Sequence, residues 1–199
     1  VPVGWEVSRA KFISTVFVPQ RNKPELNDEA GVAWATMEDM KGSYIEKTKN
    51  YVDSESGKIA GSKTLKAGAV IASCVGNFDV ASINKIDVII NQQLQAFIPN
   101  SIKAEYLRET IGISKSYFEL IGTAATLVYV NQQGFENLPV LVPHSDEQEK
   151  ICEHIEKKCL DFQQLISFSE QAIELMQERR TALISAAVTG KIDVRDWGD

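Results

Sequence analysis

The sequence predicts an α+β protein, in which a mixed α/β domain over residues 1–143 is followed by one long C-terminal α-helix, within residues 144–199, that forms a coiled coil. Two observations lead to this prediction. The region from 146 to 189 contains neither proline nor glycine and repeats its apolar residues in sevens. The region before it carries short β-branched runs between polar turns, and 44% of the 199 residues are hydrophobic, enough for a buried core.

The elements of residues 1–143 are predicted from apolar runs and from the turn residues between them. Residues 101–121 are predicted as helical, with Ile102, Tyr106 and Leu107 among their apolar side chains. The expected strands are 65–73, 85–97 and 124–130, and the expected polar loops are 22–31 and 56–63.

The long helix has clear start and stop signals. Ser145 and Gln148 match a capping box, in which the serine hydroxyl accepts from the Gln148 amide and the Gln148 side chain reaches back. Acidic residues in the first turn suit the helix dipole, and Gly190 supplies a C-cap. At roughly 1.5 Å per residue, this helix is about 65 Å long, which exceeds the diameter of a small domain.

An apolar stripe runs along this helix. From Cys152 to Ala187, nine of eleven heptad positions are apolar, the exceptions being Ser169 and Arg180. So long a stripe predicts a partner helix, in a coiled coil or against another subunit, and a helix folded back on its own domain is the alternative. The predicted seam residues are Ile151, Ile155, Phe162, Ile166, Ile173, Met176 and Leu183.

The charge is unevenly distributed. Residues 1–143 hold 14 Lys and Arg against 15 Asp and Glu, whereas residues 144–199 hold 7 against 12 and so carry most of the net charge of −6. Between 41 and 66, six lysines stand against three acidic residues. This local excess is consistent with a phosphate-facing patch and equally with a solvated lysine face.

Several kinds of catalytic or metal site are excluded by spacing. The glycines at 57 and 61 are four apart and Ser62 precedes Lys63, so the segment is not a phosphate-binding loop. Cys152 and Cys159 would lie about 10.5 Å apart along one helix, too far for one zinc ion. No Gly-x-Ser-x-Gly elbow and no Pro-Pro dipeptide of an amino-methyltransferase loop occur. We therefore expect no metal site and no enzyme activity.

Other classes are excluded by composition. No apolar run reaches the roughly 18 residues of a membrane span, so the sequence disfavours a membrane-spanning protein. Three cysteines without framework spacing suggest a reducing compartment, which we expect to be the cytoplasm.

Polar recognition chemistry remains. Asn and Gln amides read adenine edges, Lys and Arg read guanine, and Ser and Thr are adaptable. Each such residue, taken alone, is also consistent with a turn or a strand-end amide. The candidate DNA-binding residues are Lys41, Ser43, Lys58, Lys63, Thr64, Ser73, Asn77, Asn91 and Gln92.

Several segments together resemble a known family. Residues 138–143, followed by Glu147, Gln148 and Ile151, resemble the proline-rich hinge and helix start of type I restriction–modification specificity subunits. The end of the helix is the most specific match. The matching stretches are 178–184 and 187–195 in the helix region, and 1–5, 33–39, 65–68 and 91–93 in the domain.

The resemblance implies a half-length specificity subunit, with one target recognition domain and one conserved helix. It implies that the domain reads half of a bipartite site in double-stranded DNA. It also implies that the helix docks methyltransferase subunits, and that a restriction and motor subunit joins the complex. S-adenosylmethionine, ATP and Mg²⁺ would be bound by those partners and not by this chain. The alternative is a coiled-coil scaffold or antirestriction protein that reads no DNA.

The unpaired stripe further predicts an antiparallel homodimer through the long helix. Two copies of one recognition domain would read two identical half-sites in inverted orientation. From a rod of about 65 Å we expect an unspecified spacer on the order of 5–8 base pairs.

Overall fold

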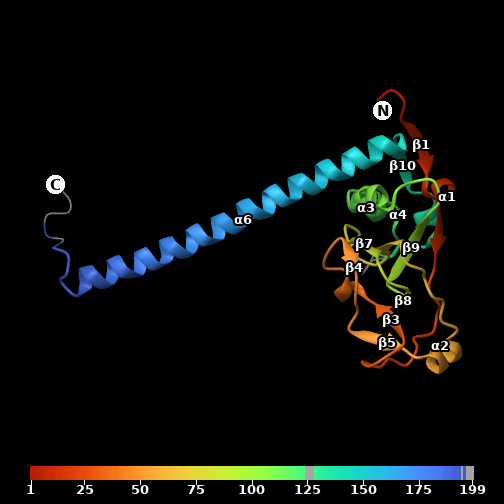
Figure 1. Cartoon of the computed structure of the whole chain (residues 1–199), viewed down its shortest axis with the longest axis horizontal. Coiled ribbons are helices and arrows are strands. Elements are labelled where there is room, and N and C mark those ends of the chain that lie inside the picture. Colours follow the sequence, from red (N-terminus) through yellow and green to blue (C-terminus); the bar gives the residue numbers. More distant parts are fainter. Residues whose placement is uncertain (124–127, 194, 196–199) are drawn as a thin grey trace. The chain divides into compact units, whose positions relative to one another are not determined.

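The computed structural model describes residues 1–123, 128–193 and 195 (Figure 1). It divides into two compact units, Val1–Cys152 and Glu153–Asp199, which are described separately below. The first unit extends beyond the expected boundary at 143, because Ile151 and Cys152 pack against its core.

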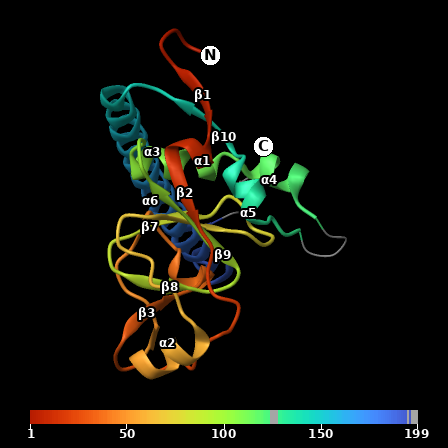
Figure 2. The same cartoon turned by 90° about the vertical axis from the view of Figure 1, so that its right-hand side faces the viewer.

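The described residues of the first unit form three β-sheets (Figures 1 and 2). A two-stranded sheet pairs β1 (Glu6–Arg9) with β10 (Pro139–Val142). A five-stranded sheet has the order β2 (Ser14–Phe17), β9 (Leu94–Pro99), β6 (Val70–Ser73), β7 (Ala81–Asn84) and β4 (Tyr44–Ile45). A three-stranded sheet has the order β5 (Asn50–Val52), β3 (Val32–Ala35) and β8 (Val88–Ile90).

Short helices connect and cover these sheets. They are α1 (Ala10–Ile13), the 3₁₀ turn η1 (Met37–Asp39), α2 (Ser54–Ala60), α3 (Ala104–Gly112), α4 (Lys115–Ile121) and α5 (Gln132–Glu136). The main core includes Phe97, Phe118 and Phe135, which are fully buried. The ring of Phe135 lies 5.3 Å from that of Phe97 and 5.0 Å from that of Phe118, which joins the five-stranded sheet to α4 and α5.

The predicted elements are largely present, with shifted bounds. The region 101–121 forms two helices, and the run 85–97 forms two strands separated by a turn at 91–93. The expected strand 65–73 is regular only from Val70, although Leu65 makes an isolated bridge to Val88. Of the expected strand 124–130, residues 124–127 lie outside the described residues, and Tyr129 bridges to Val75 and Thr123.

The predicted loop at 56–63 is wrong, because residues 54–60 form helix α2. Asp53 caps this helix, since its carboxylate accepts hydrogen bonds from the amides of Glu55 and Ser56. The pKa of Asp53 is lowered mainly because Ser56 donates to it through both amide and hydroxyl. Gly61 ends the helix in the left-handed conformation, at φ 64°.

The predicted capping box at the start of the long helix is also wrong. The Gln148 side chain, 3% exposed, donates through Nε2 to the carbonyl of Pro143 and accepts through Oε1 from the amide of Lys103, both at 2.9 Å. The side chain of Lys103 also contacts Glu149, at 2.8 Å. Gln148 therefore connects the start of the long helix to the start of α3.

The long helix α6 runs over Ser145–Val188, close to the predicted bounds. Its end is a Schellman motif, in which Lys191 N donates to Ala186 O, Gly190 N donates to Ala187 O, and Gly190 has φ 69°. Most large apolar side chains of its second-unit part are exposed. Among the described helices, none combines the length and apolar character needed to cross a membrane.

Candidate nucleic-acid interface

The three-stranded sheet gathers polar segments at one edge. Strands β3 and β8 are parallel, with Ala35 opposite Ile90, so their carboxyl ends lie together. The residues that follow them are η1 and the 91–93 turn, and Asn91 N donates to Ala35 O at 3.1 Å. Strand β5 is antiparallel to β3, so Thr48 and Lys49, just before β5, reach the same edge. We call this edge, with its adjoining segments, the carboxyl edge.

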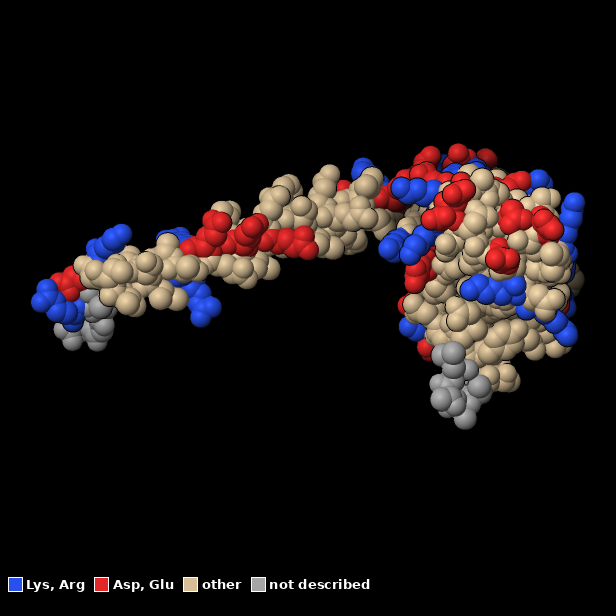
Figure 3. All heavy atoms as spheres, turned by 90° about the horizontal axis from the view of Figure 1, so that it is seen from below, with Lys and Arg blue, Asp and Glu red and all other residues tan. Residues whose placement is uncertain are grey.

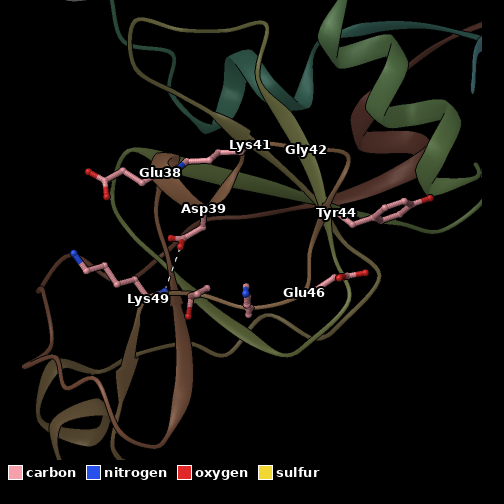
Figure 4. A pocket seen from close by; sticks show the side chains of 9 residues that line it. Glu38, Asp39, Lys41, Gly42, Tyr44, Glu46 and Lys49 are labelled. Carbon is pink, nitrogen blue, oxygen red and sulfur yellow. Dashed lines mark hydrogen bonds between the residues drawn. The ribbon is translucent and has the colours of Figure 1, made fainter. Parts of the chain in front are cut away.

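A hollow of about 540 Å³ opens at the carboxyl edge, between η1, β4 and the segment before β5. Asp39 shapes it, since Oδ2 accepts from the amide and hydroxyl of Thr36 at 2.8 Å each and Oδ1 accepts from Lys49 N at 3.4 Å. In Figure 4, Lys41, Glu38 and Lys49 extend to one side, and Tyr44 and Glu46 point to the other. The lining residues are Glu38, Asp39, Lys41, Gly42, Tyr44, Glu46, Lys47, Thr48 and Lys49.

The charge at this hollow is mixed. Lys41, Lys47 and Lys49 are exposed, and the Asp39 carboxylate is engaged by main-chain and hydroxyl donors. A fourth lysine, Lys85, lies with its ammonium 4.0 Å from the ring centre of Tyr44. On the face drawn in Figure 3, basic and acidic side chains of the first unit are interspersed rather than gathered in one band. On this face the lysines are therefore separate and do not form a continuous basic band.

A second group of polar residues adjoins the carboxyl edge around Gln20. The Gln20 side chain is 5% exposed, and its Oε1 accepts from Lys63 N at 3.3 Å. Gln92 Nε2 donates to the main-chain carbonyls of Gln20 and Arg21. Three segments that are distant in sequence therefore meet here. They carry Arg21, Lys63 and Gln92, whose side chains are exposed.

The turn after β6 lies beside the 91–93 turn. Cys74 N donates to Gln93 O at 2.9 Å, and the strands β6 and β9 on either side are paired. Asn77 in this turn is exposed, whereas Ser73 is buried and its hydroxyl donates to Val75 O. Burial raises the pKa of the Cys74 thiol to about 11. Asn77 is thus available to a ligand, but Ser73 and Cys74 are not.

The predicted DNA-binding residues fall into distinct places. Lys41 lines the 540 Å³ hollow and Ser43 lies in the same loop, whereas Lys63 and Gln92 both contact Gln20, and Asn91 precedes Gln92 in the 91–93 turn. Ser73 and Asn77 lie at the turn after β6. Lys58 and Thr64 line a separate hollow of about 380 Å³ beside α2. The Asn91 side chain already makes one hydrogen bond within the protein, because its Oδ1 accepts from Gln93 N at 3.1 Å.

Sequence reasoning missed several residues of this surface. Lys47 and Lys49 belonged to the local lysine excess but were not among the predicted DNA-binding residues. The signal that could have found them is their position just before a strand, β5. Arg21, Tyr44 and Lys85 gave no local signal, since their positions follow from pairing between distant segments. No group of three or more His, Cys, Asp and Glu side chains in the described ranges could hold a metal ion.

The predicted seam residues also divide between the units. Ile151 is partly buried and packs against the first unit's core, and its assignment to the seam stays a prediction. Ile155 is half-buried. The other five seam residues are exposed on α6, as are Leu160, Phe168 and Leu175, which are not among the predicted seam residues.

Comparisons with known proteins point to one family. A family model described as type I restriction modification DNA specificity domain matches residues 2–174. The specificity subunit of the Escherichia coli type I restriction enzyme EcoR124I/EcoR124II is 21% identical over 146 residues, covering 70% of this chain and 36% of the relative. The Thermoanaerobacter tengcongensis HsdS subunit has a similar fold, with a TM-score of 0.63 and 18% identity, over 79% of this chain and 38% of that one.

Two further solved structures share the fold. A chain from a study of assembly and conformational transition of the type I R-M system aligns with a TM-score of 0.77 and 16% identity, over 94% of this chain and 46% of that one. The type I restriction-modification system S subunit from M. genitalium aligns with a TM-score of 0.56 and 11% identity, over 91% of this chain and 46% of that one. The chain thus spans less than half the length of these relatives.

Proposed function

Because the chain belongs to the type I restriction modification DNA specificity domain family, we propose that its first unit reads one half of a bipartite duplex DNA site. The observation that carries this proposal is the convergence of exposed Lys63, Gln92 and Arg21 around Gln20, beside the carboxyl edge. Lysines on segments bordering the adjacent hollow supply phosphate contacts, and amides supply contacts to base edges. Lys58 and Thr64 extend the surface toward α2.

The long helix supports a role in assembly, because it exposes apolar side chains on two faces. Phe162, Ile166 and Ile173 belong to the predicted seam. Leu160, Phe168 and Leu175 are each two residues from one of these, hence roughly 160° away around the axis. Two exposed apolar faces favour two partners.

We assign the seam face to a second copy of this chain in antiparallel orientation, and the other face to a methyltransferase subunit. In such a dimer each copy contributes one recognition domain, so the DNA site consists of two inverted, identical half-sites. The restriction and motor subunit joins through the complex. S-adenosylmethionine, ATP and Mg²⁺ chemistry belongs to these partners, in agreement with relatives that are named specificity subunits.

The DNA proposal is tested by binding of the full chain to random-sequence duplex over a range of salt concentrations, with and without the methyltransferase subunit. Lys41→Ala, Lys49→Ala and Lys58→Ala are compared with Lys11→Ala, an exposed lysine on α1. Each phosphate-contacting lysine should lower the salt slope by about one unit, and Lys11→Ala should not. Absence of binding under both conditions would favour the coiled-coil scaffold instead.

A further inference from the structure

The amide of Gln92 has a defined orientation. Its Nε2 donates to the carbonyl oxygens of Gln20 and Arg21, at 3.4 Å each. A carbonyl oxygen can only accept a hydrogen bond, so these two neighbours determine which end of the amide is the nitrogen. Both hydrogens of Nε2 point to the protein, and Oε1 is the end left for a ligand.

The segments that hold Gln92 are themselves fixed. Gln20 is nearly fully buried and accepts from Lys63 N, which keeps its own carbonyl in place. Two main-chain hydrogen bonds hold the turn that carries Gln92. Asn91 N donates to Ala35 O before Gln92, and Gln93 O accepts from Cys74 N after it. Gln92 is exposed on this fixed base, and within residues 1–123, 128–193 and 195 its side-chain hydrogen bonds are the two made by Nε2.

Resting on the proposed function, we propose that Gln92 determines sequence specificity as a pure hydrogen-bond acceptor. Oε1 accepts from the exocyclic amino group of one base in the major groove, either adenine N6 or cytosine N4. Guanine and thymine present the acceptors O6 and O4 there, and an acceptor facing Oε1 is unfavourable. A free glutamine amide would instead read adenine with both of its ends, so the anchoring of Nε2 is what extends the choice to cytosine.

The test uses the full chain and duplexes that carry a randomised block, from which bound sequences are selected and read. Wild type is compared with Gln92→Leu, which has no acceptor, and with Gln92→Glu, which keeps one. Gln93→Leu is the matched control, because Gln93 is an exposed glutamine of the same turn. We expect one position restricted to adenine or cytosine in wild type and in Gln93→Leu. We expect it relaxed in Gln92→Leu and also in Gln92→Glu, whose carboxylate cannot donate to the carbonyls of Gln20 and Arg21.

A second measurement removes the amino group from the DNA. The base at that position is replaced by its analogue without the exocyclic amino group, and affinity is measured by titration. Wild-type affinity should fall about 3- to 10-fold, as for the loss of one hydrogen bond, and that of Gln92→Leu should not change. The inference is overturned if wild type is indifferent to the amino group or if Gln92→Leu selects the same sequences. If wild type selects no sequence at all, the proposed function itself fails.

Discussion

Gln148 lies near the end of the first unit. Replacing it by methionine should strongly lower the free energy of unfolding of that unit. The substitution removes two hydrogen bonds of 2.9 Å and leaves Lys103 N and Pro143 O without their partner. Each bond contributes about 1 kcal/mol net, and an orphaned buried group costs about 1–3 kcal/mol. We therefore expect a loss of about 2–4 kcal/mol, which for a unit of this size lowers Tm by roughly 5–15 °C.

The control is Glu149→Gln, which removes only the exposed ion pair with Lys103. The pKa of Glu149 is lowered mainly by the hydrogen bond from Lys103, so this pair stabilises the protein at neutral pH and loses its effect as pH falls through that pKa. An ion pair this exposed to solvent contributes little to stability. Thermal and denaturant unfolding measure both variants, and a Gln148→Met protein no less stable than Glu149→Gln would refute the reasoning.

Further predictions concern assembly, DNA and chemistry. If the chain forms the proposed dimer, Ile166→Lys with Ile173→Lys should convert it to a monomer by light scattering, because both charges would enter the proposed seam; a dimeric double variant would contradict that seam. Deleting residues 163–169, one heptad, should shorten the preferred spacer and keep the half-sites, as methylation mapping with the partner subunit would show. Lys63→Ala should lower the salt slope of DNA binding by about one unit. Cys74, with its pKa near 11, should resist alkylation at pH 8 in the folded protein and react after unfolding, as mass spectrometry would detect.

The seam prediction shows what a heptad pattern can predict about a helix and what it cannot. The heptad pattern selected apolar positions from Phe162 to Leu183 that are exposed on α6, and their role as a seam stays a prediction. It also included Ile151, which the structure packs into the first unit's core. A repeat describes which side chains share a helix face, but the same face can pack against different neighbours along its length.

The sequence by itself determined α6 and its C-cap, because proline-free periodicity, a lone Gly190 and the resemblance of 187–195 are all local signals. It selected Lys63 and Gln92 by residue type alone, without showing that they meet. Only the tertiary structure decided that Gln20 joins them, that Gln148 bonds to Lys103, and that Lys49 reaches the hollow. The physical reason is that these partners lie far apart in sequence. Their contacts form only when strand pairing, such as that of β3 with β5 and β8, and packing bring distant segments together, which no local pattern encodes.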